Sequence, residues 1–337
     1  MTTHVDKPAV ETPTPSDSPP PRRSFAQRTG ADRFSGLYVW AALIVLFAVW
    51  VPDTFLTVNN ARIIAGDAAV SAMLALALIV PLAAGVFDLA IAATMGLSTV
   101  TVILLISKGW DIPLAMLTGL LVGFVVGAAN GFIVDKLHVD SFIGTLGMSS
   151  ILASATYFVV DGAQIYLVDQ PGFQKFATAQ FLGLPLVFFY MMVLALVLAY
   201  VLEYTPLGRR VYAVGGNPQA ARLAGVSVRK VIFYSLLTSG ALAGAIGVIL
   251  ASKLGTANTT VGPSYLLPAF SAAFLGATQV LPGRFNVPGT LVAIGMLSTG
   301  VKGLQLAGAP LYVNDLFNGA ALIIAVALAA RSTRAQT

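Results

Sequence analysis

Residues 69–107 read AVSAMLALALIVPLAAGVFDLAIAATMGLSTVTVILLIS, and Asp88 is the single charged side chain among them. A helix needs roughly 20 apolar residues to cross the hydrocarbon core of a bilayer. With the residues just before it, the stretch is long enough for two such helices. Pro81 and Gly85 interrupt the run before Asp88, as in the discontinuous helices that expose backbone groups to a cavity within the membrane. The stretch therefore predicts two spans and one broken helix near Pro81–Asp88.

The composition of the whole chain supports this interpretation. Of its 337 residues, 57% are hydrophobic and 10% are charged, whereas a soluble domain typically carries about 25% charged residues. The apolar runs are continuous and do not alternate every second residue, as they would in a β-barrel. We therefore predict an all-α integral membrane protein with about ten transmembrane helices. The predicted spans are residues 36–52, 60–80, 85–107, 113–134, 142–160, 181–202, 231–252, 264–281, 287–306 and 311–330.

The positions of lysine and arginine predict how these spans are oriented. Fourteen of the 19 lysine and arginine residues fall in segments on the same side as the two termini, and five fall on the opposite side. By the positive-inside rule, both termini are then cytoplasmic. The same distribution accounts for the net charge of +5 without a nucleic-acid partner.

The chain divides into three predicted parts. Residues 1–35 are rich in proline and arginine and bury too little apolar surface to offset the entropy of ordering, so we expect a disordered cytoplasmic tail. Residues 36–330 are the transmembrane domain, which includes a basic cytoplasmic loop at 203–230. Residues 331–337 are a second, short cytoplasmic tail.

The sequence carries no signal of catalysis. It has no cysteine, which excludes a thiolate metal site and a cysteine nucleophile. It has no Gly-x-x-x-x-Gly-Lys-Ser/Thr phosphate loop, so we do not expect this chain to hydrolyse ATP. Its two histidines, His4 and His138, are far apart and predict no metal cluster. We expect neither enzymatic activity nor a cofactor.

A short helix is predicted inside the loop 203–230. Asn217 is a good N-cap, Pro218 suits the first helical position, and Gly225 is placed to end the helix. From geometry alone, this helix is either a docking element for another protein or an ordinary connector between two spans.

A resemblance bears on that choice. Residues 206–226, PLGRRVYAVGGNPQAARLAGV, resemble the signature loop of ribose-type (monosaccharide) ABC transporter permeases. In that family the loop forms the coupling helix that inserts into the ATP-binding subunit. The resemblance continues in short, glycine-dominated matches at residues 145–148, 240–247, 274–277, 288–290 and 318–319. The coupling residues that it implies are Gly215, Gly216, Asn217, Ala220, Ala221, Arg222 and Gly225.

The resemblance implies a function and a set of partners. The chain would be the permease subunit of an ATP-driven importer in the bacterial inner membrane, moving a monosaccharide or another small polar solute. It would work with ABC ATP-binding subunits, a solute-binding receptor, and a second permease copy or a paralogue. The chain itself would be surrounded by membrane lipid.

Two acids, Asp88 and Asp67, lie inside predicted spans. Asp88 either caps the resumed helix alone or also borders the translocation path, which would include Gly85, Asp88 and Leu89. This segment resembles a motif of the same permease family but departs from it at Val86, Phe87 and Ala90. These residues make this side of the path bulkier and less polar.

Asp67 lies either in the bundle interior or at a solvated outer edge. Arg284 is interpreted as a topology anchor. Ser71, Ser98 and the Gly123-xxx-Gly127 pattern are expected to join helices.

Two other classes of protein remain alternatives. An ion-coupled secondary transporter would need a paired acid or cation site in the membrane, for which Asp88 and Asp67 are the candidates. An intramembrane enzyme would need a catalytic dyad, and the sequence suggests none.

Overall fold

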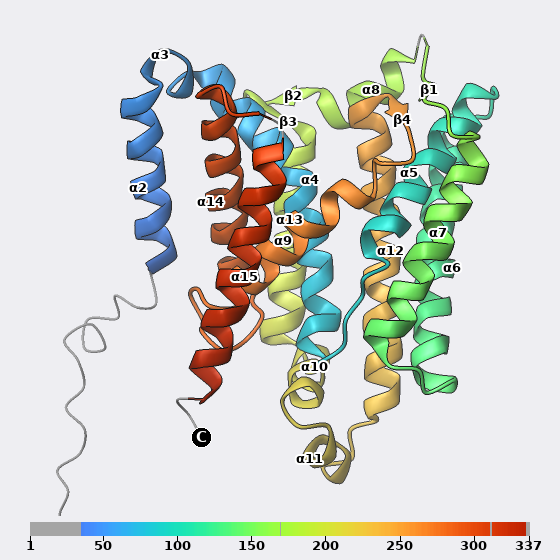
Figure 1. Ribbon diagram of the computed structural model, residues 1–337. Helices are drawn as coiled ribbons and strands as arrows, with labels where there is room; N and C mark the ends of the chain where they lie inside the picture. Colours follow the sequence, from blue (N-terminus) through green and yellow to red (C-terminus); the bar gives the residue numbers. More distant parts are fainter. Residues whose placement is uncertain (1–34, 169, 311, 335–337) are drawn as a thin grey trace, which may run out of the picture. The chain divides into compact units, whose positions relative to one another are not determined.

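Helices make up most of the computed structural model, which describes residues 35–168, 170–310 and 312–334 (Figure 1). The predicted tail at 1–35 lies outside the described residues except for Ser35. The elements are α2 (Ser35–Trp50), α3 (Pro52–Phe55), α4 (Val58–Ala83), α5 (Ile91–Ser107), α6 (Ile112–Lys136), α7 (Ser141–Val160), β1 (Ile165–Tyr166), α8 (Pro171–Thr178), β2 (Gln180–Phe181), β3 (Leu184–Pro185), α9 (Leu186–Tyr204), α10 (Pro206–Gly216), α11 (Pro218–Leu223), α12 (Val228–Leu254), β4 (Thr256–Ala257), η2 (Pro263–Tyr265), α13 (Leu266–Gly276), α14 (Val287–Leu306) and α15 (Tyr312–Arg334).

Each of the ten predicted spans contains a helix, but the helices differ in length. Six of those in the described residues are long and apolar enough to cross a membrane, namely α4, α6, α7, α9, α12 and α14. Shorter apolar helices occur in α2, α5 and α15, and α13 has 11 residues, fewer than the predicted span 264–281. The all-α membrane architecture is therefore confirmed, while the number of ten spans stays a prediction.

The predicted break between the second and third spans lies slightly later in the chain than expected. Helix α4 continues through Pro81 and ends at Ala83, and α5 begins at Ile91 and not at residue 85. The Pro81 carbonyl accepts hydrogen bonds from the Ala84 and Val86 amides, both at 3.0 Å, at the end of the helix. Gly85 then adopts the left-handed conformation, with φ of 81°, and ends the helical path.

The centre of the bundle is built on close contact between α6 and α12. A Cβ added to Gly240 of α12 would lie 2.5 Å from the Gly127 Cα of α6. A Cβ added to Gly123 of α6 would lie 2.5 Å from the Gly244 Cα of α12. Ser98 of α5 donates its hydroxyl to the carbonyl oxygens of Gly119 and Gly244, at 3.0 and 2.9 Å, which joins three helices. The expected helix-joining roles of the small residues are confirmed at these positions.

Two ends of the bundle differ in character (Figure 1). One end carries α10 and α11, which extend beyond the long helices. The opposite end carries α3, α8 and two short antiparallel sheets, in which β1 pairs with β4 and β2 pairs with β3. The strands are only two residues long, and the sequence did not predict them.

Candidate functional site

The loop between α9 and α12 folds into two short helices. The predicted helix is confirmed as α11, where the Asn217 Oδ1 accepts a hydrogen bond from the Ala220 amide at 2.9 Å and Gly225 is left-handed. Helix α10 was missed, although its start repeats the same signal. Thr205 caps it by accepting from the Gly208 amide, and Pro206 occupies the first helical position.

The tip formed by α11 presents a distinct surface. The Leu223 side chain is 91% exposed at this tip. Ala221 is only 5% exposed because it packs inward with Val214 and Val228. Six of the seven predicted coupling residues are therefore exposed, and Ala221 instead holds α11 onto the bundle.

The C-terminal end of α10 rests directly on the break that follows α4. A Cβ added to Gly215 would overlap the Ala83 carbonyl oxygen, and a Cβ on Gly85 would lie 3.3 Å from the Gly215 Cα. Only glycine permits this approach of two backbones. The exposed loop and the irregular segment inside the bundle are thus in contact.

The break itself is held by side chains from other helices. Asp88 is 1% exposed, and its Oδ1 accepts from the Ala90 amide at 3.1 Å while its Oδ2 accepts from the Ser239 hydroxyl of α12 at 2.6 Å. At the start of α7, Ser141 and Thr145 accept hydrogen bonds from the amides of Phe87 and Leu89. Asp88 therefore fixes the backbone just before α5 and ties it to α12.

Asp88 is buried in this segment, whereas Gly85 and Phe87 reach the surface. The Phe87 ring is partly exposed and lies 6.1 Å from the Phe142 ring of α7 and 6.4 Å from the Phe274 ring of α13, measured between centroids. The break thus presents an aromatic wall, in line with the bulkier and less polar character expected from its sequence.

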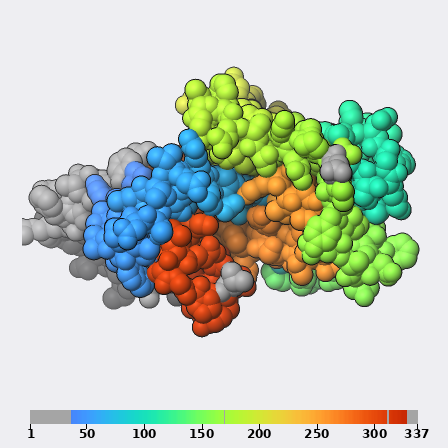
Figure 2. Space-filling model, turned by 90° about the horizontal axis from the view of Figure 1, so that it is seen from above, coloured from blue at the N-terminus to red at the C-terminus, as the bar shows by residue number. Residues whose placement is uncertain are grey.

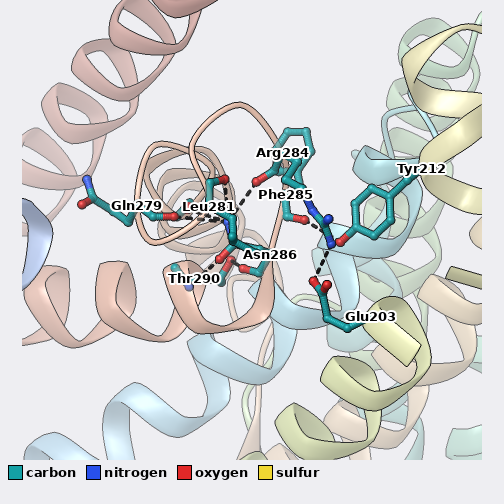
Figure 3. Close-up of polar contacts among 10 residues, drawn as sticks. Glu203, Tyr212, Gln279, Leu281, Arg284, Phe285, Asn286 and Thr290 are labelled. Carbon is teal, nitrogen blue, oxygen red and sulfur yellow. Dashed lines mark hydrogen bonds and ion pairs between the residues drawn. The ribbon is translucent and has the colours of Figure 1, made fainter. Parts of the chain in front are cut away.

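A second polar cluster joins α10 to the turn between α13 and α14 (Figure 3). The Tyr212 hydroxyl donates to the Phe285 carbonyl at 2.7 Å, and the Arg284 guanidinium lies 4.1 Å from the centre of the Tyr212 ring. Arg284 also pairs with Glu203, at the end of α9, at 2.5 Å. Burial raises the pKa of the Tyr212 phenol above its usual value, so it keeps its proton and donates at neutral pH.

Asn286 organises the turn that carries Arg284 (Figure 3). It is fully buried, and its Oδ1 caps α14 by accepting from the Gly289 amide at 2.7 Å. Its Nδ2 lies within hydrogen-bonding distance of four backbone carbonyls, those of Gly276, Gln279, Leu281 and Arg284. Arg284 is consequently a defined link between elements, and the sequence identified it only as a topology anchor.

The acid at the other end of α4 has a different environment. Asp67 is 61% exposed at its side chain and pairs with Lys253 of α12 at 2.8 Å. Asp67 therefore lies at an exposed edge and not in the interior of the bundle. Among the described residues, no group of three or more acidic, histidine or cysteine side chains could hold a metal ion.

Comparisons with known proteins give related sequences over most of the chain. Residues 60–326 match the family described as branched-chain amino acid transport system / permease component. The ribose import permease protein of Bacillus subtilis is 34% identical over 298 residues, covering 88% of this chain and 91% of that protein. In Escherichia coli, the L-arabinose transport system permease protein is 29% identical (92% and 94% covered) and the D-allose transport system permease protein is 28% identical (88% and 91% covered). No solved structure matches the chain.

Proposed function

Because the chain belongs to the branched-chain amino acid transport system / permease component family, we propose that it is the membrane-spanning subunit of an ATP-driven importer for a monosaccharide or polyol. The relatives described above are named as permeases for ribose, L-arabinose and D-allose, which supports a small polyhydroxylated solute. The chain is a transport subunit and not an enzyme, so ATP is hydrolysed on a separate subunit.

The proposed mechanism depends on one contact, in which Gly215 of α10 packs against Ala83 and Gly85. In the proposed cycle, ATP-binding subunits bind the exposed tip of α11, which includes Leu223. Their closure displaces α10, and α10 passes the displacement through Gly215 to the break between α4 and α5. Two close-packed backbones transmit such a movement well because packed interiors are stiff.

The break would form part of the translocation path, with Gly85, Asp88 and Leu89 as its predicted members. The conformation and hydrogen bonds of the break support a different role for each of these residues. Gly85 provides the left-handed turn, while Asp88 fixes the backbone through Ala90 and Ser239. The partly exposed Phe87 would then be the side chain that faces the solute.

The remaining partners follow from the same assignment. We propose that two ATP-binding subunits meet α10 and α11 on the cytoplasmic side, with both termini on that side. A solute-binding receptor would dock at the opposite end, near α3 and α8. A second copy of the chain or a paralogue would complete the path within the bacterial inner membrane.

Co-purification with the cognate ATP-binding subunit tests the docking of α11. Leu223→Glu places a charge on a side chain that is 91% exposed, so it spares the fold of the bundle. Leu182→Glu is a matched control, because Leu182 is 83% exposed between β2 and β3 at the opposite end. We expect Leu223→Glu to lose the ATP-binding subunit and Leu182→Glu to retain it. Equal retention by both variants would show that α11 is only a connector.

A further inference from the structure

A small cavity with both polar and apolar residues in its lining is found at the end of the bundle opposite to α10 and α11. It has a volume of about 160 Å³ and is enclosed by α4, α13, α14 and α15. Figure 2 views this end, where the red segment that includes α15 lies beside the blue start of α4. Ile294, Leu297 and Val301 form an apolar wall, and the polar residues of the lining are Asp67, Ser71, Ser298, Lys302, Gln305 and Asn318.

Some of these polar groups are fixed by the protein. Asp67 is held at the rim by its ion pair with Lys253. Gln305 donates to the Asn314 side chain at 3.2 Å, and the Asn318 amide nitrogen donates to the Asn314 carbonyl at 2.9 Å. These contacts orient the frame of the cavity before any ligand enters it.

Three other polar groups in the lining have no protein partner within the described residues. Lys302 is half-buried, yet none of the ion pairs formed there includes it. The hydroxyls of Ser298, one turn before Lys302 on α14, and of Ser71 on α4 likewise make no hydrogen bond with another described group. Unpaired donors that line a cavity are where water or a polar ligand binds.

The position of Lys302 also has a simple structural explanation, which is that it extends from near the end of α14 to the aqueous phase. That explanation does not account for the two unpaired hydroxyls that face the same cavity from two helices. A half-buried cation together with hydroxyl, amide and carboxylate groups offers both donors and acceptors at short range. Sugar hydroxyls, which donate and accept, match such a lining.

We propose that this cavity is a contact site for the hydroxyl groups of a monosaccharide-sized polyol on its way into the importer. Lys302, Ser71 and Ser298 supply the contacts that the protein leaves open, and Asp67 and Asn318 complete the rim. The volume is below the roughly 300–1,000 Å³ of pockets for drug-sized ligands, which restricts the ligand to a small solute. The inference rests on the proposed function, since it takes this end of the bundle to face the receptor.

The absence of cysteine from the chain permits a direct test. Ser298→Cys would be the single thiol in the complete importer subunit, reconstituted in vesicles with its ATP-binding subunits and receptor. The rate of its modification by a small, water-soluble methanethiosulfonate is measured with and without D-ribose, L-arabinose or D-allose. We expect the sugar that is transported to slow modification several-fold. Ser107→Cys, an exposed serine at the C-terminal end of α5, should be modified at the same rate with and without sugar.

Uptake by a second pair of variants provides an independent test. Lys302→Met should lower the rate of sugar uptake several-fold, and Lys302→Arg should restore part of it. Lys108→Met removes an exposed lysine from the segment after α5 and should have no effect. Wild-type uptake by Lys302→Met, together with no protection of Ser298→Cys, would overturn the inference and leave the proposed function standing. Failure of the wild-type importer to take up any of the three sugars with ATP would refute the proposed function, and the inference with it.

Discussion

Gly215→Ala tests the contact through which the mechanism is proposed to act. The added Cβ would lie 2.9 Å from the Ala83 carbonyl carbon and closer still to its oxygen, and neither backbone atom can rotate away. Overpacking of this kind costs about 1–3 kcal/mol. Alanine also stabilises a helix by roughly 0.5–1 kcal/mol relative to glycine. This favourable effect has to be separated from the cost of the clash.

Gly216→Ala provides that separation, because a Cβ at Gly216 meets no atom within 4 Å. Both substitutions lie in α10 and bring the same gain in helix propensity, so their difference isolates the clash. We expect Gly215→Ala to be less stable than Gly216→Ala by about 1–3 kcal/mol, or roughly 5- to 150-fold in the equilibrium constant for unfolding.

The assay is reversible denaturation of the isolated chain in mixed detergent micelles, where no ATP-binding subunit is present. Sugar uptake per ATP hydrolysed is then compared between Gly215→Ala and wild type, and it should fall in the variant. If the two alanine variants unfold at the same denaturant concentration, α10 is not seated on Ala83 as described. If Gly215→Ala is destabilised but transports with wild-type stoichiometry, the contact is structural and does not transmit movement.

Three further predictions concern the packing and polar links. Gly123→Ala should destabilise the chain by about 1–3 kcal/mol relative to Gly147→Ala, whose Cβ meets no atom within 4 Å, in the same denaturation assay. Tyr212→Phe should lose about 1 kcal/mol of stability, because the bond to the Phe285 carbonyl is removed while the ring stays over the guanidinium. The Tyr212 pKa is raised in the folded state, so its contribution to stability is present below pH 10 and is lost as the pH rises through the folded pKa. Raising the pH above 10 should therefore lower the free energy of unfolding more for wild type than for Tyr212→Phe. Asp88→Asn, which keeps an acceptor for the Ala90 amide, should preserve a higher unfolding temperature than Asp88→Ala, and equal losses would contradict a stabilising role of that hydrogen bond.

Elements governed by local sequence were predictable. Each apolar run predicted a helix because hydrophobic length is a property of the segment itself, and α11 was predicted because Asn217, Pro218 and Gly225 are its own cap, first turn and stop. The boundary near Pro81 was less accurate. Proline removes a donor but tolerates a helix that ends within the next turn, so α4 continues past Pro81 to Ala83, and the left-handed Gly85 lies within the break.

Contacts between distant segments were not predictable from one sequence. The pairing of Arg284 with Glu203 spans 81 positions, and nothing near either residue indicates the other. Ala221 looked equivalent to Ala220 because both are small and helical. Its inward orientation depends on where α10 and α12 place Val214 and Val228.

The hydroxyl of Ser98 also constrains the order in which the protein can be assembled during its synthesis. One of its acceptors, Gly119, is 21 positions later, and the other, Gly244, is 146 positions later. At about 5–20 residues per second, the second acceptor leaves the ribosome roughly 7 to 30 s after Ser98. Helices α5 and α6 can therefore pair as a hairpin early, with the glycine face of α6 turned to lipid or to the insertion machinery. Helix α12 has to arrive as a late component that displaces whatever covers that face.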